Sequence, residues 1–214
     1  MIMAGIRIAV MASGSGTDLQ SVIDACEDGR IDGSVVVVIS DNKDAFALER
    51  ARRHGIPAHY VPRKKDRKEH EMAIAEIIDS YRVDLIVLAG YIRMLTPWFV
   101  EKYRGRIINI HPALLPLFGG PGMYGMKVHE AVLESGMKVS GCTVHFVDEN
   151  VDGGPIILQR CVPVLEDDTP ETLRERVLEE EHRALPEAVS LFAQGRLVIE
   201  GKRVRILQKN DGDG

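Results

Sequence analysis

The sequence contains few cysteines, and they are widely spaced. Cys26, Cys142 and Cys161 are odd in number and form no CxxC pair. A disulfide framework needs an even, dense set of cysteines, and a cysteine-ligated zinc site needs closely spaced pairs. No H-x-x-x-H cluster is present either. The sequence therefore predicts three reduced packing cysteines and no metal site.

Long apolar runs and an excess of one charge are also absent. No apolar run approaches the roughly 20 residues that a membrane-spanning helix needs. The start, MIMAGIRIAVMASGSG, lacks the charged segment and cleavage pattern of a signal peptide. The 27 basic and 32 acidic residues are mixed and give a net charge of −5, which provides no field for nucleic acid or an anionic membrane. We therefore expect a cytoplasmic protein whose partners are small molecules or a second copy in a homodimer.

Apolar runs alternate with helical patterns over most of the 214 residues. The runs, several of them apolar on both faces, are IRIAVMA, VVVVIS, AHYVP, DLIVLAG, RIINI, CTVHFV and PIILQRCVPV. Such strands are typical of sheets covered by helices on both faces, and strand–helix alternation favours parallel pairing. The sequence thus predicts an α/β fold with a doubly wound, mostly parallel sheet. We expect a single domain at 1–207 and a disordered tail at 208–214.

Three later features interrupt the alternation. Glycines crowd the segment 119–125, which predicts a flexible loop before a helix at about 128–134. A long helical pattern follows with Pro170 in its first turn, and Pro186 is expected to kink or divide it. The stretch RLVIEGKRVRI predicts a hairpin that turns at 200–201.

The first candidate site is the glycine-rich ASGSGTDLQ between the first strand and the first helix. Gly14 and Gly16 allow a tight turn close to an anion, and Thr17 and the first helical amides are able to hold phosphate oxygens. A dinucleotide fingerprint needs a third glycine where this chain has Leu19. The motif predicts a site for one phosphate; a glycine turn without a ligand is the alternative.

The second candidate site is LAGYIRMLT, at the exit of the fourth strand. Ile92, Met94 and Leu95 surround the single cation of Arg93. This composition suits a flat heteroaromatic ligand with one hydrogen-bonded edge. The alternative is a set of core residues that precede a helix.

The third candidate site is NIHPALLP, at the end of a buried strand. Asn109 and His111 are two residues apart, so both side chains point to one side of the strand. The turn VDENVDGGPI supplies carboxylates, among them Asp152. Amide, imidazole and carboxylate together provide an oxyanion donor, a proton carrier and a group that keeps the imidazole charged.

These groups are the equipment for acyl transfer without a covalent enzyme intermediate. No serine lies in a G-x-S-x-G elbow, and no activated nucleophile is evident. The alternatives are a core histidine at His111 and a solvated acidic turn at Asp152. We expect a structural role for His145, which alternates with apolar residues, and surface positions for His129 and His182.

These motifs, together with ISDNKDAFALERARRHGI and EEEHRALPEAV, resemble the phosphoribosylglycinamide formyltransferase family from about Ile6 to Arg205. The resemblance implies the formyltransferase fold, with a Rossmann-like N-terminal half. It also implies formyl transfer from 10-formyltetrahydrofolate to glycinamide ribonucleotide in de novo purine synthesis, by direct amine attack through a tetrahedral intermediate and without a metal. A formyltetrahydrofolate hydrolase is expected to carry a regulatory domain before the first strand.

The resemblance also implies a role for each matching residue. Asn109 and His111 correspond to the pair that meets the formyl oxygen, and Asp152 corresponds to the aspartate that supports the charged imidazole. The residues implied to bind the nucleotide substrate are Gly16, Thr17, Asp18 and Glu181. The residues implied to bind the folate are Lys68, Ile92, Arg93, Met94, Leu95 and Asn109.

Two other functions remain open from the sequence. A formyltetrahydrofolate hydrolase would release formate without glycinamide ribonucleotide. A non-catalytic nucleotide-binding module would use only Gly14 and Gly16, and it would leave Asn109, His111 and Asp152 without a reason.

Overall fold

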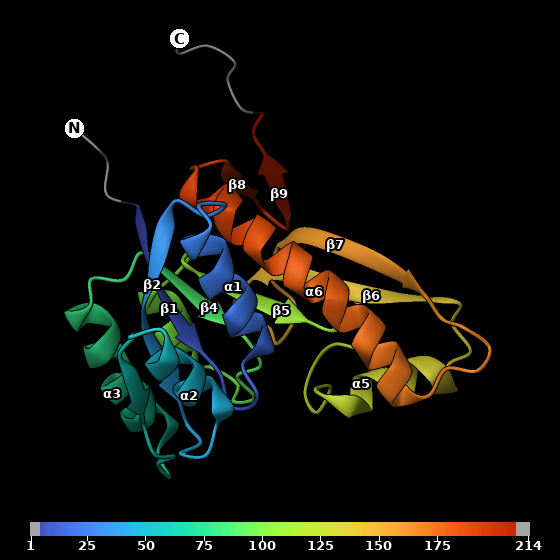
Figure 1. The fold of residues 1–214 in the computed structure, drawn as a ribbon, viewed down its shortest axis with the longest axis horizontal. Helices are drawn as coiled ribbons and strands as arrows, with labels where there is room; N and C mark the ends of the chain where they lie inside the picture. Colours follow the sequence, from blue (N-terminus) through green and yellow to red (C-terminus); the bar gives the residue numbers. More distant parts are fainter. Residues whose placement is uncertain (1–4, 209–214) are drawn as a thin grey trace.

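A computed structural model describes residues 5–208, which form one layered α/β unit (Figure 1). Their strands make one nine-stranded sheet in the order β3-β2-β1-β4-β5-β6-β7-β9-β8. The strands are β1 (Ile6–Met11), β2 (Gly33–Ser40), β3 (Ala58–Tyr60), β4 (Leu85–Leu88), β5 (Ile107–His111), β6 (Val139–Phe146), β7 (Ile156–Pro163), β8 (Leu197–Glu200) and β9 (Arg203–Ile206). The helices are α1 (Thr17–Glu27), α2 (Phe46–Arg53), α3 (Arg67–Ser80), α4 (Pro97–Lys102), α5 (Met126–Glu134) and α6 (Pro170–Ala193).

Strand pairing confirms the predicted doubly wound, mostly parallel sheet. Strands β3, β2, β1, β4 and β5 are parallel neighbours. Strand β6 runs antiparallel to both β5 and β7, and the β8–β9 hairpin adds a last antiparallel pair. The carboxyl ends of β1, β4 and β5 therefore meet at one edge of the sheet, where open α/β sheets bind their ligands.

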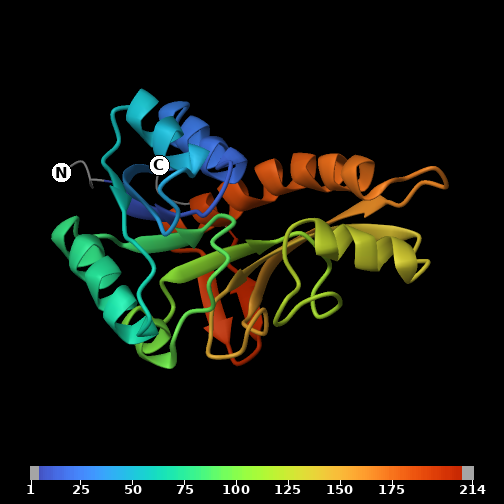
Figure 2. The ribbon, with the colours of Figure 1, turned by 90° about the horizontal axis from the view of Figure 1, so that it is seen from below.

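Alternating apolar side chains divide the core into two layers. In β1, Ile8 and Val10 pack under α1, α2 and α6, whereas Ala9 and Met11 pack toward α3 and α4 on the other face. This two-residue period is the geometry of an extended strand buried on both sides. Figure 2 shows the two helical layers on opposite sides of the sheet.

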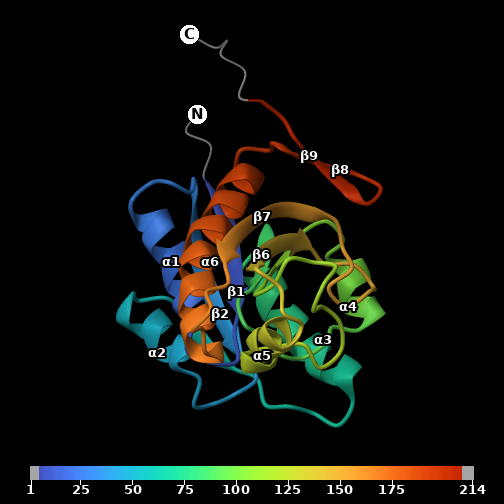
Figure 3. The same cartoon turned by 90° about the vertical axis from the view of Figure 1, so that its right-hand side faces the viewer.

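Pro186 was predicted to kink or divide the last helix, and the structure shows that it does not divide it. Helix α6 runs without interruption from Pro170 to Ala193, with Pro186 inside it. A proline inside a helix removes one backbone hydrogen bond. Ala184, Leu185 and Pro186 are buried, and α6 packs along α1, β6 and β7 (Figure 3). This burial offsets the lost bond.

The other two predictions for the later part of the chain agree with the structure. Helix α5 follows the glycine-rich segment, and β8 and β9 form a hairpin around Gly201. The predicted tail lies outside the described residues except for Gln208. Within 5–208, no helix is long and apolar enough to cross a membrane.

Candidate active site

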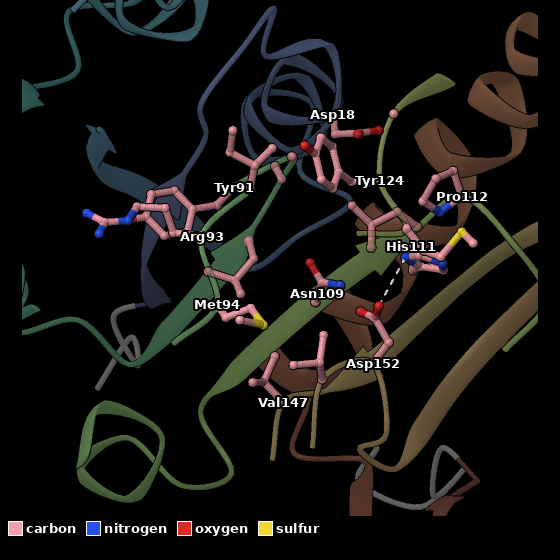
Figure 4. Close-up of a pocket in the computed structure, with 18 of the residues that line it drawn as sticks. Asp18, Tyr91, Arg93, Met94, Asn109, His111, Pro112, Tyr124, Val147 and Asp152 are labelled. Carbon is pink, nitrogen blue, oxygen red and sulfur yellow. Dashed lines mark ion pairs between the residues drawn. The ribbon is translucent and has the colours of Figure 1, made fainter. Parts of the chain in front are cut away.

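A cavity of about 380 Å³ opens at the carboxyl ends of β1, β4 and β5. It is lined by the glycine loop after β1, by the exit of β4 and by the end of β5, three neighbouring strands of the sheet. The connection from β5 to α5 and the turn between β6 and β7 complete the walls, with part of α6. One cavity therefore contains all three of the motifs that the sequence singles out (Figure 4).

Asn109 and His111 enter the cavity from the same face of β5. Ile108 and Ile110 point into the opposite layer, under α6, so the polar pair takes the face that opens at the sheet edge. The His111 side chain is buried, and its Nε2 donates to the carbonyl oxygen of Phe118 at 2.8 Å. This bond leaves Nδ1 as the atom that gains a proton when the ring becomes charged.

Asp152 lies beside that atom. Its Oδ2 is 3.7 Å from His111 Nδ1 and accepts a hydrogen bond from the backbone nitrogen of Gly120 at 2.9 Å. Asp152 has a φ of +54°, an uncommon conformation that the surrounding turn holds in place. The turn requires Gly154, since a Cβ there would lie 1.8 Å from the carbonyl oxygen of Phe146. The structure thus places a carboxylate against the imidazole, as the sequence predicts.

The sequence analysis missed His145, which lines the cavity from β6. Its Nδ1 donates to the Phe146 carbonyl at 2.8 Å, so its Nε2 is an acceptor in the neutral ring. Asn109 Nδ2 donates to that Nε2 at 3.1 Å. Burial lowers the pKa of His145, which favours the neutral form. The neutral ring fixes the orientation of the Asn109 amide and leaves its second N–H free to meet a ligand.

The glycine loop after β1 forms a further part of the cavity wall. Gly16 has a φ of +71°, and a Cβ on it would lie 2.8 Å from the Cα and Cβ of Ala47. Helix α1 begins at Thr17, so its first amides face the cavity at the positive end of the helix dipole. This is the predicted geometry for an anionic group.

Two carboxyl groups lie beside this anion-binding end. Burial raises the pKa of Asp18 to about 7, against a lowering effect of Arg174. Burial, and then the charge of Asp18, raises the pKa of Glu181 well above its ordinary value. Asp18 Oδ1 is 3.7 Å from His182 Nε2, and neither atom has a hydrogen-bond partner among the described residues. Both acids therefore tend to hold a proton, which limits the negative charge that would repel a phosphate.

Asp18→Asn should stabilise the fold, and more so at high pH. The raised pKa means that the folded chain retains a proton that the unfolded chain releases above about pH 4, so the stability contributed by Asp18 is lost as pH rises toward 7. We expect the variant to raise Tm by about 5 °C at pH 8 and by less than about 2 °C at pH 5. Thermal unfolding at the two pH values measures this difference. Asp44→Asn, which removes an exposed carboxylate, is the control, and equal shifts for both variants would contradict the assignment.

The exit of β4 lines the cavity with apolar side chains. Ile92 is 47% exposed and Met94 is 40% exposed, so both offer apolar surface to a ligand. Leu95 also lines the cavity. The guanidinium of Arg93 is turned away from Asn109 and His111 (Figure 4), and its buried Nη1 has no hydrogen-bond partner within the described chain. The exit of β4 thus offers the cavity an apolar wall, and the guanidinium of Arg93 lies outside that wall.

Lys68 is the predicted site residue that the structure does not bring to the cavity. It lies in the exposed first turn of α3, where Asp66 caps the helix by accepting from the Lys68 backbone nitrogen. The cap fixes the direction of this turn, and Lys68 is outside the cavity lining. The assignment of Lys68 to the folate came from the family resemblance alone, and no pattern in the neighbouring residues supports it.

Two further cavity residues were missed because they lie on helices. Arg174 enters from α6 and His129 from α5. One face of the predicted last helix carries Arg174, Leu178 and Glu181. This spacing could have indicated that Arg174 lies on the same side of the helix as the predicted site residue Glu181. Burial, and then the charge of Arg174, lowers the pKa of His129 to about 4, so that this ring is neutral.

The described residues contain no group of three or more His, Cys, Asp or Glu side chains arranged to hold a metal ion. The cavity instead combines an amide donor, an imidazole beside a carboxylate, an anion-binding loop and an apolar wall. Such groups are suited to stabilising negative charge on an oxygen and to moving a proton.

Comparisons with known proteins agree with this chemistry. The family described as formyl transferase matches residues 6–189. The phosphoribosylglycinamide formyltransferase of Escherichia coli is 43% identical over 90% of this chain and 89% of that protein. The chain also matches 19% of the longer trifunctional purine biosynthetic protein of Gallus gallus, at 43% identity over 91% of its own length.

Solved structures show the same likeness. The crystal structure of glycinamide ribonucleotide transformylase 1 from Symbiobacterium toebii is 53% identical, with a TM-score of 0.91 over 96% of both chains. A formyltetrahydrofolate deformylase from Pseudomonas syringae is 26% identical, with a TM-score of 0.88 over 96% of this chain and 67% of that chain. The chain belongs to the formyl transferase family, in its phosphoribosylglycinamide formyltransferase branch.

Proposed function

We propose that this chain transfers the formyl group of 10-formyltetrahydrofolate to the amine of glycinamide ribonucleotide, a step of de novo purine biosynthesis. The observation that carries the proposal is that one cavity joins the glycine loop to Asn109, His111 and Asp152. The loop end suits the phosphate of the nucleotide, and the exit of β4 suits the flat ring of the folate. The reacting groups then meet beside Asn109 and His111 of β5.

The folate brings a formyl carbon that a nucleophile is able to attack. Asn109 holds its free N–H toward the cavity, where it is able to stabilise the negative charge that develops on the formyl oxygen. His111 supplies a positive charge at the same place when its ring is protonated, and Asp152 stabilises that charge from 3.7 Å. As the amine bonds to the formyl carbon and the carbon–nitrogen bond to the folate breaks, the protonated ring gives its proton to the departing folate nitrogen, and the neutral ring then takes the proton that the amine loses.

The side chains at the exit of β4 support the assignment of this segment to the folate. Ile92 and Met94 present apolar surface to the cavity. Such apolar walls suit a flat heteroaromatic ring. Ile92, Arg93, Met94 and Leu95 therefore form the proposed folate subsite, with Asn109 at its inner end.

Formyltetrahydrofolate hydrolysis is the closest rival, because a deformylase shares the fold. The glycine loop favours transfer, since hydrolysis of a folate needs no second subsite for an anion. The decisive assay incubates purified protein with 10-formyltetrahydrofolate, with and without glycinamide ribonucleotide, and follows folate absorbance and formate. Transfer predicts turnover that depends on the nucleotide. Formate release at the same rate without the nucleotide would reject the proposal.

Gly16→Val tests the nucleotide end. The new side chain would clash with Ala47, and valine does not tolerate a φ of +71°. We expect the KM for glycinamide ribonucleotide to rise by about 10-fold or more and the KM for the folate to stay within about twofold. Gly55→Val is the matched control: Gly55 has a φ of +67°, but a Cβ there meets nothing within 4 Å. Equal losses for the two substrates would contradict the assignment of the loop.

A further inference from the structure

Helix α2 contacts the back of the glycine loop through two hydrogen bonds. The backbone nitrogen of Ala47 donates to the carbonyl oxygen of Gly14 at 3.1 Å, and Nε of Arg50 donates to the carbonyl oxygen of Ser15 at 2.8 Å. Arg50 does not line the cavity, whereas Gly14, Ser15 and Gly16 do. The two donors therefore hold the loop from the side opposite to the ligand.

The direction of these carbonyl groups fixes the direction of the amides that follow them. In a trans peptide the C=O and the next N–H point to opposite sides. The carbonyls of Gly14 and Ser15 point to α2, so the N–H groups of Ser15 and Gly16 point away from α2. Neither of these two nitrogens donates to an acceptor in the described part of the chain. They are free donors that face the anion-binding end.

The guanidinium of Arg50 is itself held in one orientation. It lies over the ring of Phe46 at 5.0 Å from the centroid, and its Nη1 donates to Gln20 Oε1 at 3.3 Å. Gln20 belongs to α1, and its own Nε2 donates to Asp24 at 2.8 Å. Arg50 thus connects α2, the glycine loop and the first turns of α1 through a planar group with fixed donor directions.

We propose that Arg50 is a positioning residue for the nucleotide substrate. It turns the Ser15 carbonyl toward α2 and so aims the Gly16 amide at the phosphate, without contacting the ligand. This inference rests on the proposed function, because it takes the glycine loop to be the phosphate subsite. It adds a residue outside the cavity to the determinants of nucleotide affinity.

Three substitutions separate the geometry of Arg50 from its charge. Arg50→Met retains an apolar stem of similar length, Arg50→Lys retains the charge but loses the Nε–H, and Arg53→Met is the matched control. Arg53 lies on the same helix and also stacks on Phe46, at 5.2 Å, but its Nε bonds only Glu49. The readouts are the steady-state KM and kcat for glycinamide ribonucleotide, the KM for 10-formyltetrahydrofolate, and thermal unfolding to confirm that each variant is folded.

We expect Arg50→Met and Arg50→Lys to raise the KM for the nucleotide by about 10-fold and to change kcat and the folate KM by less than about twofold. Arg53→Met should match the wild type in all three constants. A nucleotide KM that rises for Met but not for Lys would overturn the proposal, because charge alone would then explain the effect. Losses shared by both substrates, or by Arg53→Met, would also overturn it.

A phosphate-free probe separates failure of this proposal from failure of the proposed function. The affinities of glycinamide ribonucleotide and of glycinamide riboside are compared by calorimetry without folate. The wild type should prefer the nucleotide, and the Arg50 variants should lose about 10-fold of that preference. Wild-type protein without any preference would reject the phosphate subsite, and this inference with it. An unchanged preference in Arg50→Met would reject the role of Arg50 alone.

Discussion

Asn109→Ala should lower kcat by about 100-fold or more, because it removes the amide donor that stabilises negative charge on the formyl oxygen. One N–H of this amide is already used, since Nδ2 donates to His145 Nε2 at 3.1 Å. The other N–H is directed by that bond and needs no reorientation during the reaction. A donor fixed in advance in a buried site is worth more than one that must be ordered.

A second variant, which adds a negative charge at position 109, provides the control. Asn109→Asp has nearly the same shape as Asn109 but places a negative charge where negative charge develops, so its kcat should be lower than that of Asn109→Ala. Single-turnover rates of formyl transfer, with both substrates saturating, measure the chemical step. Because Asn109 is neutral, the pH dependence of the alanine variant should keep the wild-type shape. An Asp variant that is faster than the Ala variant would reject the role of an oxyanion donor.

The layered sheet was predictable because the apolar pattern that indicates each of its strands lies within a short stretch of sequence. Residues such as Val10 and Ile86 lie in runs that are apolar on both faces, and such runs are typical of strands covered on both faces. Gly14 and Asn109 were predictable for a related reason. Each follows or ends a parallel strand, and the carboxyl ends of parallel strands at one edge of a sheet lie close together. Asp152 follows the antiparallel β6, so its place beside His111 depends on the turn between β6 and β7.

His145 could not be recognised because its partner depends on strand register. It pairs with Asn109 across β5 and β6, although the two residues are 36 positions apart in sequence. The alternation of apolar residues around His145 predicts which face of the strand carries its side chain, but not which residue that side chain contacts. Arg50 was missed for the same reason, since only the packing of α2 against the glycine loop brings it to Ser15.

Two features could not be placed without their tertiary context. Pro186 was predicted to kink or divide the last helix, and buried residues on both sides of it keep α6 undivided. Lys68 was assigned to the folate from resemblance, and this assignment stays a prediction: the residue lies in an exposed turn that Asp66 caps, outside the cavity lining. In both cases the packing or capping of the helix decides the position of the residue, and a residue pattern does not specify it.

The charge on the imidazole leads to the second large effect. The attacking amine must be neutral, and the His111 ring must carry its positive charge when negative charge develops on the formyl oxygen. Asp152 Oδ2 is 3.7 Å from His111 Nδ1, and Nε2 already donates to Phe118, so the proton gained by the ring faces the carboxylate. Asp152→Asn keeps the shape but removes the charge that stabilises this proton.

Asp152→Asn should therefore lower kcat by about 10-fold or more, because it removes the carboxylate that faces the protonated ring. Glu149→Gln removes an exposed carboxylate from the same turn and should leave kcat within about twofold of the wild type. His111→Ala should lower kcat by about 100-fold or more. The measurement is kcat with chemistry rate-limiting. Near-wild-type kcat in Asp152→Asn would separate the carboxylate from the imidazole, and near-wild-type kcat in His111→Ala would remove the imidazole from the mechanism.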